Sequence, residues 1–171
     1  MSKLRLVKVT VEDKKKIKIY KMLQKIGKNE NGFENKGFGM SIEEYRGYID
    51  ELIEAEDPTR LKPGMVPQTV FWLYDNDEVI GFSKMRHYLN DKLRVRGGHI
   101  GYGIRKDKRN MGYGRKILEL TLEEIADLEI KEILITCDSD NIASRKVIEH
   151  NGGRLVTVTE GLCSYEISEE D

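Results

Sequence analysis

The sequence feature that most constrains the fold is a turn with two glycines, Arg109-Asn-Met-Gly-Tyr-Gly-Arg-Lys116. It follows a strand-like run, Ile100 to Ile104, and precedes a helix-like run, Ile117 to Leu128. Glycines let a backbone approach a ligand closely, and the first N–H groups of a helix lie free beside the positive end of its dipole. The turn therefore predicts a strand-to-helix junction that holds phosphate, with help from three basic residues, Arg109, Arg115 and Lys116.

Two familiar phosphate-binding loops do not fit this turn. No stretch of the chain has the P-loop pattern G-x-x-x-x-G-K-[ST]. The dinucleotide pattern G-x-G-x-x-G fails because Ile117 stands where the third glycine would be. On spacing alone, a glycine-cornered turn with a purely structural role is the alternative.

Composition excludes several classes of protein. The chain has 29 Lys and Arg against 30 Asp and Glu, so it lacks the global basic field typical of nucleic-acid-binding proteins. No apolar run approaches the roughly 18 residues of a membrane span, and the N-terminus lacks the apolar stretch of a secretion signal. Cys137 and Cys163 indicate neither a disulfide framework nor a metal site. We expect one cytoplasmic domain over residues 1–171, without nucleic-acid, membrane or metal partners.

Hydrophobic periodicity and cap signals predict a mixed α/β fold with the order β α α β β β α β α β β. Strands are expected at 4–9, 69–74, 79–88, 99–104, 132–137, 155–159 and 162–167, and helices at 14–26, 41–56, 117–128 and 143–148. The alternation of strands and helices in the middle favours parallel neighbours joined by crossovers, and the hairpins on either side favour a mixed sheet. The apolar run 132–137 is typical of a strand buried on both faces.

Two stretches, 27–40 and 90–98, are expected to be loops. The first is long for a connection within one domain, and long loops often serve function. It carries Phe33 and Phe38, whose rings either pack beneath the loop or line a substrate pocket.

The turn resembles the acetyl-CoA signature R/Q-x-x-G-x-G/A of the GNAT superfamily of N-acetyltransferases, with Arg109, Gly112 and Gly114 at its fixed positions. The segment from Asn141 to Gly152 resembles the second signature of that superfamily, N-x-x-[AS]-x-x-x-x-x-x-x-G. The element order is similar to that of GNAT proteins over essentially the whole chain. The long loop and the run from His99 to Arg105 look similar to bacterial proteins known as predicted acetyltransferases.

The resemblance implies acetyl-CoA as cosubstrate, with its pantetheine arm in a gap between the strand ending at Ile104 and the strand 133–137. Backbone groups near residues 102–104 would pair with that arm, and the amides of residues 111–115 would hold the pyrophosphate. Asn141 would hydrogen-bond the pantetheine or adjacent backbone. The expected cofactor-binding residues are Tyr102, Ile104, Arg109, Asn110, Met111, Gly112, Tyr113, Gly114, Arg115, Asn141 and Ser144.

Two positions depart from the family pattern. His99 stands where many members carry a glutamate, and it could serve as the catalytic base or make a structural hydrogen bond. Ile148 stands where many members have a tyrosine that protonates the leaving thiolate. Another tyrosine (Tyr102, Tyr113 or Tyr165) could act instead, or no acid is needed, because a thiol of pKa about 8.5 is a fair leaving group.

We therefore expect an N-acetyltransferase in which a primary amine attacks the thioester of acetyl-CoA directly. The acceptor would be a small-molecule or peptide amine, which acidic residues could attract (Glu30, Glu34, Glu43 and Glu44). The alternative is a CoA-binding sensor or interaction module without transfer activity, and a nucleotide-binding protein fits less well. A homodimer is a further expectation, because the final hairpin exposes a sheet edge.

Overall fold

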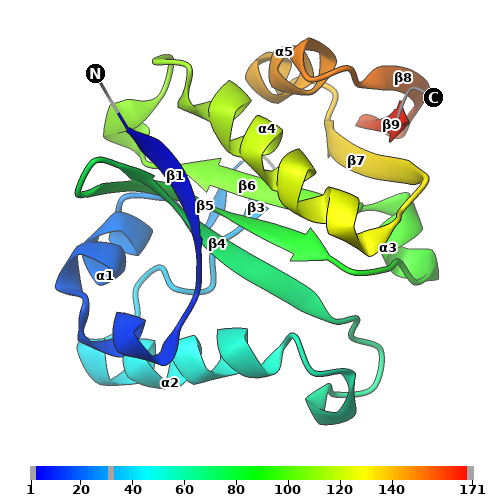
Figure 1. Cartoon of the computed structure of the whole chain (residues 1–171). Coiled ribbons are helices and arrows are strands. Elements are labelled where there is room, and N and C mark those ends of the chain that lie inside the picture. The colour runs from blue at the N-terminus through cyan, green and yellow to red at the C-terminus, as the bar shows by residue number, and fades with distance from the viewer. Residues whose placement is uncertain (1–2, 31–32, 169–171) are drawn as a thin grey trace.

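The computed structural model describes residues 3–30 and 33–168 and contains a mixed α/β fold (Figure 1). Its strands and helices, in chain order, are β1 (Leu4–Lys8), α1 (Ile17–Gln24), β2 (Asn29–Glu30), β3 (Phe33–Glu34), α2 (Ile42–Glu54), β4 (Gln68–Asp75), β5 (Glu78–Arg86), α3 (Asp91–Val95), β6 (Ile100–Ile104), α4 (Tyr113–Ile125), β7 (Glu132–Asp138), α5 (Ile142–His150), β8 (Arg154–Thr159) and β9 (Leu162–Ser168).

The strands form two main sheets that meet at β6 and β7. One sheet has the order β1-β4-β5-β6, and the other has the order β7-β9-β8. Every ladder among the described residues is antiparallel, so the expected parallel pairing is wrong. The α4 crossover does connect β6 to β7, but these strands form no ladder in the described structure and a cavity lies between them. A sequence pattern cannot distinguish a paired strand from a splayed one, because both bury the same apolar residues.

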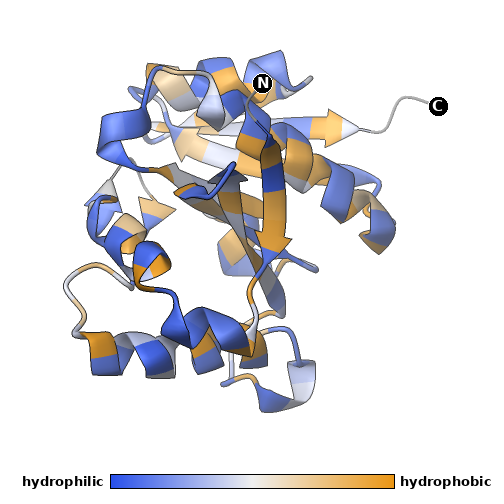
Figure 2. Ribbon diagram, turned by 60° about the vertical axis from the view of Figure 1, so that its left-hand side comes forward, coloured by the Kyte–Doolittle hydropathy of each residue, from blue (hydrophilic) through white to orange (hydrophobic). Residues whose placement is uncertain are grey.

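Helices cover both faces of the first sheet. On one face, α1 and α2 pack against Trp72 and Phe82 through buried residues such as Ile19 and Ile49. On the other face, α4 packs over β5 and β6, and its buried side chains join a core that continues into the second sheet. Figure 2 shows the helices with hydrophobic and hydrophilic residues on different sides, as expected of elements that cover a sheet. The glycine turn thus lies on the α4 side of the first sheet, opposite α1 and α2.

Local capping explains the helix that the sequence predicts most clearly. Ser41 accepts a hydrogen bond from the Glu44 N–H (3.2 Å), and the Glu44 carboxylate accepts one from the Ser41 N–H (2.7 Å). This capping box starts α2, and Asp57-Pro58 follows its end. The prediction over 41–56 is confirmed to within two residues at its end.

Three local predictions are corrected. The loop expected over 90–98 contains α3, because Asn90 caps that helix by accepting a hydrogen bond from the Leu93 N–H (3.0 Å). The helix expected over 14–26 is divided into a 3-10 helix (Val11–Lys15) and α1, because Asp13 turns inward to accept a hydrogen bond from Trp72. The strand β7 alternates between buried and half-buried residues and is not buried on both faces.

Candidate cofactor and acceptor site

The glycine turn forms the start of α4. Gly112 is the N-cap residue, and its φ of 87° is a left-handed conformation that favours glycine. The first hydrogen bond of the helix joins the Lys116 N–H to the Gly112 carbonyl at 3.2 Å. Within the part of the chain that the structure describes, the N–H groups of residues 111–115 donate to no protein acceptor. Free donors beside a helix N-terminus have a geometry that suits an anion, and the sequence predicts such an arrangement at this turn.

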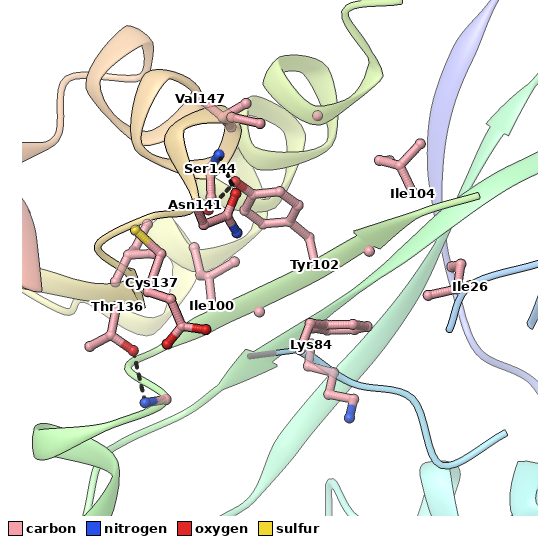
Figure 3. A pocket seen from close by; sticks show the side chains of 18 of the residues that line it. Ile26, Lys84, Ile100, Tyr102, Ile104, Thr136, Cys137, Asn141, Ser144 and Val147 are labelled. Carbon is pink, nitrogen blue, oxygen red and sulfur yellow. Dashed lines mark hydrogen bonds between the residues drawn. The ribbon is translucent and has the colours of Figure 1, made fainter. Parts of the chain in front are cut away.

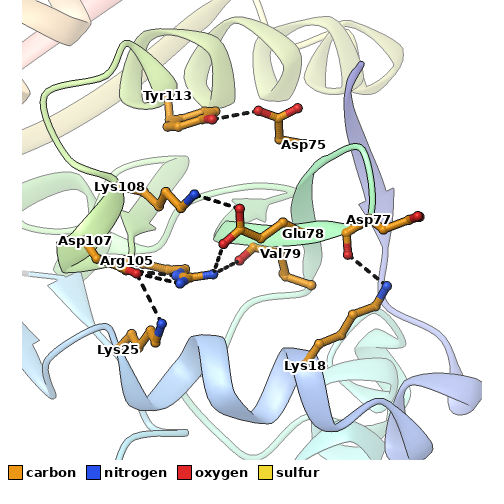
Figure 4. Close-up of polar contacts among 10 residues, drawn as sticks. All are labelled: Lys18, Lys25, Asp75, Asp77, Glu78, Val79, Arg105, Asp107, Lys108 and Tyr113. Atoms are coloured by element: carbon orange, nitrogen blue, oxygen red, sulfur yellow. Dashed lines mark hydrogen bonds and ion pairs between the residues drawn. The ribbon is translucent and has the colours of Figure 1, made fainter. Parts of the chain in front are cut away.

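An ion-pair network fixes the segment that leads into this turn (Figure 4). Arg105 is buried and donates to the carboxylates of Glu78 (2.8 Å) and Asp107 (2.6 Å). Lys108 donates to the second carboxylate oxygen of Glu78 at 2.7 Å. Hydrogen bonds from Arg105 hold the pKa of Asp107 well below its ordinary value, so this carboxylate stays charged at neutral pH. The network ties the chain after β6 to the β4–β5 hairpin and thereby positions the turn.

His99 joins the two sheets just before β6 begins. Its N–H donates to the Leu134 carbonyl (2.7 Å), and its Nδ1 accepts a hydrogen bond from the Leu134 N–H (3.0 Å). Because Nδ1 is an acceptor, the proton of the neutral ring lies on Nε2. Burial, with Arg94 as a lesser cause, lowers the pKa of His99 to about 4. His99 is not among the residues that line the cavity described next, so its geometry favours the structural alternative over the expected base.

One cavity of about 800 Å³ joins the glycine turn to the gap between β6 and β7 and continues to the other face of β6. Most of the expected cofactor-binding residues line it, namely Tyr102, Ile104, Arg109, Asn110, Gly112, Gly114, Arg115, Asn141 and Ser144. Met111 and Tyr113 do not. The Met111 side chain is exposed, and the Tyr113 hydroxyl donates to Asp75 at 2.6 Å. For these two residues only the backbone N–H groups could serve an anion.

Polar side chains from β6 and α5 meet inside this gap (Figure 3). Asn141 caps α5 by accepting a hydrogen bond from the Ser144 N–H (3.1 Å). The Ser144 hydroxyl lies 3.1 Å from the Tyr102 hydroxyl. Burial raises the pKa of Tyr102 to about 12, so its phenol is protonated at neutral pH. Of the three tyrosines considered from the sequence, Tyr102 is the one that lines the cavity. The Tyr165 hydroxyl instead hydrogen-bonds with Arg145 and Glu149 of α5.

Arg109 makes a contact that the sequence does not predict. Its Nε donates a hydrogen bond to the Ile104 carbonyl at 3.0 Å, at the end of β6. This carbonyl was expected to pair with a pantetheine arm, and it already has a protein partner. Arg109 therefore lines the cavity and also fixes the end of the strand before the turn.

The opposite face of β6 forms the second half of the cavity. The Phe33 ring lies against Gly101 and Gly103, where an added Cβ would come within 3.4 and 2.8 Å of it. The glycines of this strand therefore mark a close approach by an aromatic ring. Phe33 lines the cavity, as one of the two alternatives predicts, whereas Phe38 is exposed and lies outside it.

Two basic residues of β5, Lys84 and Arg86, line this half of the cavity and were missed in the sequence. Their signal is a pair of charged residues two apart in an otherwise apolar strand, which places both on one face. Of the acidic residues expected to attract an amine, Glu34 lines the cavity, and Glu43 and Glu44 do not. The side chain of Glu30 lies outside the described residues.

The fold, with one cavity that extends over both faces of β6, is that of an acetyltransferase of the GNAT class. The family model of the acetyltransferase (GNAT) domain matches residues 3–154, and the chain therefore belongs to this family. A comparison with curated proteins found no match.

Solved structures of GNAT acetyltransferases share the fold at low sequence identity. YncA of Salmonella typhimurium, solved with its cofactor acetyl-CoA, is 12% identical with a TM-score of 0.64, covering 98% of this chain and 95% of its own. RimL, a ribosomal L7/L12 α-N-protein acetyltransferase solved with coenzyme A, is 16% identical with a TM-score of 0.65, covering 96% and 93%. The microcin C7 self-immunity acetyltransferase MccE, solved with acetyl-CoA and AMP, is 14% identical with a TM-score of 0.66, covering 96% and 92%. At these identities the likeness establishes the fold.

In the described part of the chain, no helix combines the length and the apolar character needed to cross a membrane.

Proposed function

We propose that this protein is an N-acetyltransferase that transfers the acetyl group of acetyl-CoA to a primary amine. The observation that carries the proposal is the single cavity that joins the free amides at the start of α4 to the gap between β6 and β7. Amide donors at a helix N-terminus suit a pyrophosphate, and a gap between two strands suits an extended arm. GNAT proteins solved with acetyl-CoA or coenzyme A share the fold and support this assignment.

Acetyl-CoA would supply an activated thioester and a thiolate leaving group. An attacking amine must be neutral, and an α-amino group with an ordinary pKa of about 8 is partly neutral at physiological pH. The buried ring of His99, with Nδ1 already accepting a hydrogen bond, is a poor proton acceptor. We therefore assign His99 a positioning role at the junction of the two sheets, and we propose that water takes the proton of the amine.

We assign Tyr102 the stabilisation of the departing thiolate. Its pKa of about 12 lies well above the ordinary thiol pKa of about 8.5, so complete proton transfer from the phenol to the thiolate would be uphill. A hydrogen bond from the protonated phenol lowers the energy of the developing charge without such a transfer. Ser144, 3.1 Å from the Tyr102 hydroxyl, holds that group in place.

The test is a thiol-release assay with acetyl-CoA and a panel of primary amines. Tyr102→Phe should lower kcat by about 10- to 100-fold and leave the Kd for acetyl-CoA within about twofold, because the lost hydrogen bond acts mainly in the transition state. Tyr88→Phe, at an exposed position outside the cavity, is the matched control and should match wild type. Acetyl-CoA binding without thiol release for any amine would instead support a CoA-binding module.

Two expectations, a homodimer and a cytoplasmic location, stay predictions. The strand β8 is the edge of its sheet and exposes Leu155, Val156 and Val158, which supports a homodimer formed along this edge. Size-exclusion chromatography with light scattering would test it, and a monomer at all concentrations would contradict it. The cytoplasmic location would be tested by cell fractionation.

A further inference from the structure

Two cations line the half of the cavity that lies opposite the glycine turn. Lys84 of β5 is the register partner of Gly101 in β6, and Arg86 lies two residues further along the same face of β5. Only 8% of Lys84 is exposed. Its Nζ donates to the main-chain oxygen of Glu34 (2.9 Å) and lies 5.2 Å from the centre of the Phe33 ring. The Lys84 ammonium therefore lies in a largely apolar wall (Figure 3).

Neither cation forms an ion pair with a carboxylate among the described side chains, although the Glu34 carboxylate attracts Lys84 from a greater distance. Arg86 donates to the main-chain oxygens of Gly97 (3.3 Å) and Gly98 (2.9 Å), and no carboxylate forms an ion pair with it or with Lys84. Arg105 makes the contrast clear, because it is also 8% exposed and pairs with two carboxylates. A buried charge without a partner is costly, and two like charges on one strand face add repulsion. Glu34 is the carboxylate that attracts Lys84, but it forms no ion pair with either cation, so a ligand could supply an anionic group in direct contact with both.

We propose that the acceptor is a small amine that also carries a carboxylate or a phosphate, and that Lys84 and Arg86 bind this anionic group. The inference rests on the proposed transfer function, since it concerns the acceptor of that reaction. It reverses the sequence-based expectation that acidic residues attract a cationic amine.

The position of Lys84 limits the size of the acceptor. Because Lys84 is paired with Gly101, its backbone lies one strand spacing, about 4.8 Å, from β6 and hence close to the gap. The amine must reach the thioester in that gap while the anion contacts Lys84, so the two groups are a few bonds apart. The apolar part of the acceptor would pack on Phe33, which lines the same wall. Free amino acids and phosphorylated short amines have this spacing, whereas a lysine side chain of a protein does not.

Calorimetric titration of the CoA-saturated protein with matched pairs of probes tests this proposal. The pairs are leucine and leucinamide, phenylalanine and phenylalaninamide, and phosphoethanolamine and ethanolamine. We expect at least one member with a carboxylate or phosphate to bind at least tenfold more tightly than the partner that lacks this group, and the pair that shows this distinguishes carboxylate from phosphate. Lys84→Met should abolish the preference and Lys84→Arg should retain it. Lys21→Met, at an exposed position outside the cavity, is the charge-matched control and should retain it as well.

The proposal would be overturned if the members without the anionic group bound as tightly as those with it, or if no member with the anionic group bound. An undiminished preference in a folded Lys84→Met protein would also overturn it. Thiol release measured with the same probes separates this inference from the proposed function. Binding of the probes with an anionic group, without thiol release, contradicts transfer alone. Equal release with the probes that lack this group contradicts the anionic acceptor alone.

Discussion

Lys84 and Arg105 are equally buried cations with different surroundings, and this difference predicts opposite effects of removing their charges. Burial lowers the pKa of Lys84 to about 8, which reflects a charged form that is destabilised in the fold. Lys84→Met should raise the free energy of unfolding at pH 7 by about 1 kcal/mol, because a methionine fills the same volume without charge. Arg105→Met should lower it by about 2 kcal/mol, because Glu78 and Asp107 lose the hydrogen bonds from Arg105 and keep only one lysine partner each. Urea denaturation measures both, and destabilisation by Lys84→Met would contradict the account.

His99 predicts how stability depends on pH. Its pKa is about 4 in the folded protein and about 6.5 in an unfolded chain, so between these values the unfolded chain binds the extra proton. Stability should therefore fall as the pH drops from about 7 to 4, by up to about 3 kcal/mol from this residue. His99→Asn keeps an acceptor for the Leu134 N–H and does not titrate. Denaturation curves of this variant should lack that part of the slope, and identical slopes would contradict the assignment.

At the scale of elements, the backbone of Gly112 determines how α4 begins. Its left-handed φ of 87° strains any other L-residue, although no atom lies within 4 Å of an added Cβ. Gly112→Ala should therefore cost about 1 kcal/mol by strain alone. Gly47→Ala is the matched control, because Gly47 lies within α2 with an equally open Cβ position. It should be neutral or stabilise by up to about 1 kcal/mol, and thermal unfolding that shows equal losses for both variants would refute this.

Elements with local signals were predictable from the sequence, and elements defined by packing were not. The Ser41 capping box and the Asn141 cap specify the starts of their helices through residues three apart. The break before α1 depends on Asp13, which accepts a hydrogen bond from Trp72, 59 residues away. Strand pairing likewise depends on contacts between segments that are distant in the sequence, such as β1 with β4 and β7 with β9. The alternation of strands and helices along the chain therefore gave the wrong prediction of parallel neighbours.

At the scale of the whole molecule, the two halves of the cavity differ in how far the sequence predicts them. The cofactor half is built from the glycine turn and the start of α5, which are two continuous segments with recognisable patterns. The acceptor half combines side chains from β3, β5 and the segment before β6, which only the fold brings together. We propose that residues 1–171 form one domain, as the shared cavity between the sheets supports, and a single cooperative unfolding transition would be consistent with it.

The measurement that tests the central claim most directly is calorimetric titration of the wild-type protein and two Gly112 variants with acetyl-CoA. Asn and Asp both tolerate left-handed backbone, so Gly112→Asn and Gly112→Asp differ mainly by one negative charge beside the proposed pyrophosphate site. We predict one acetyl-CoA bound per chain in wild type, and at least tenfold weaker binding to the Asp variant than to the Asn variant. Failure of the folded wild-type protein to bind acetyl-CoA, or equal affinity of the two variants, would contradict the account.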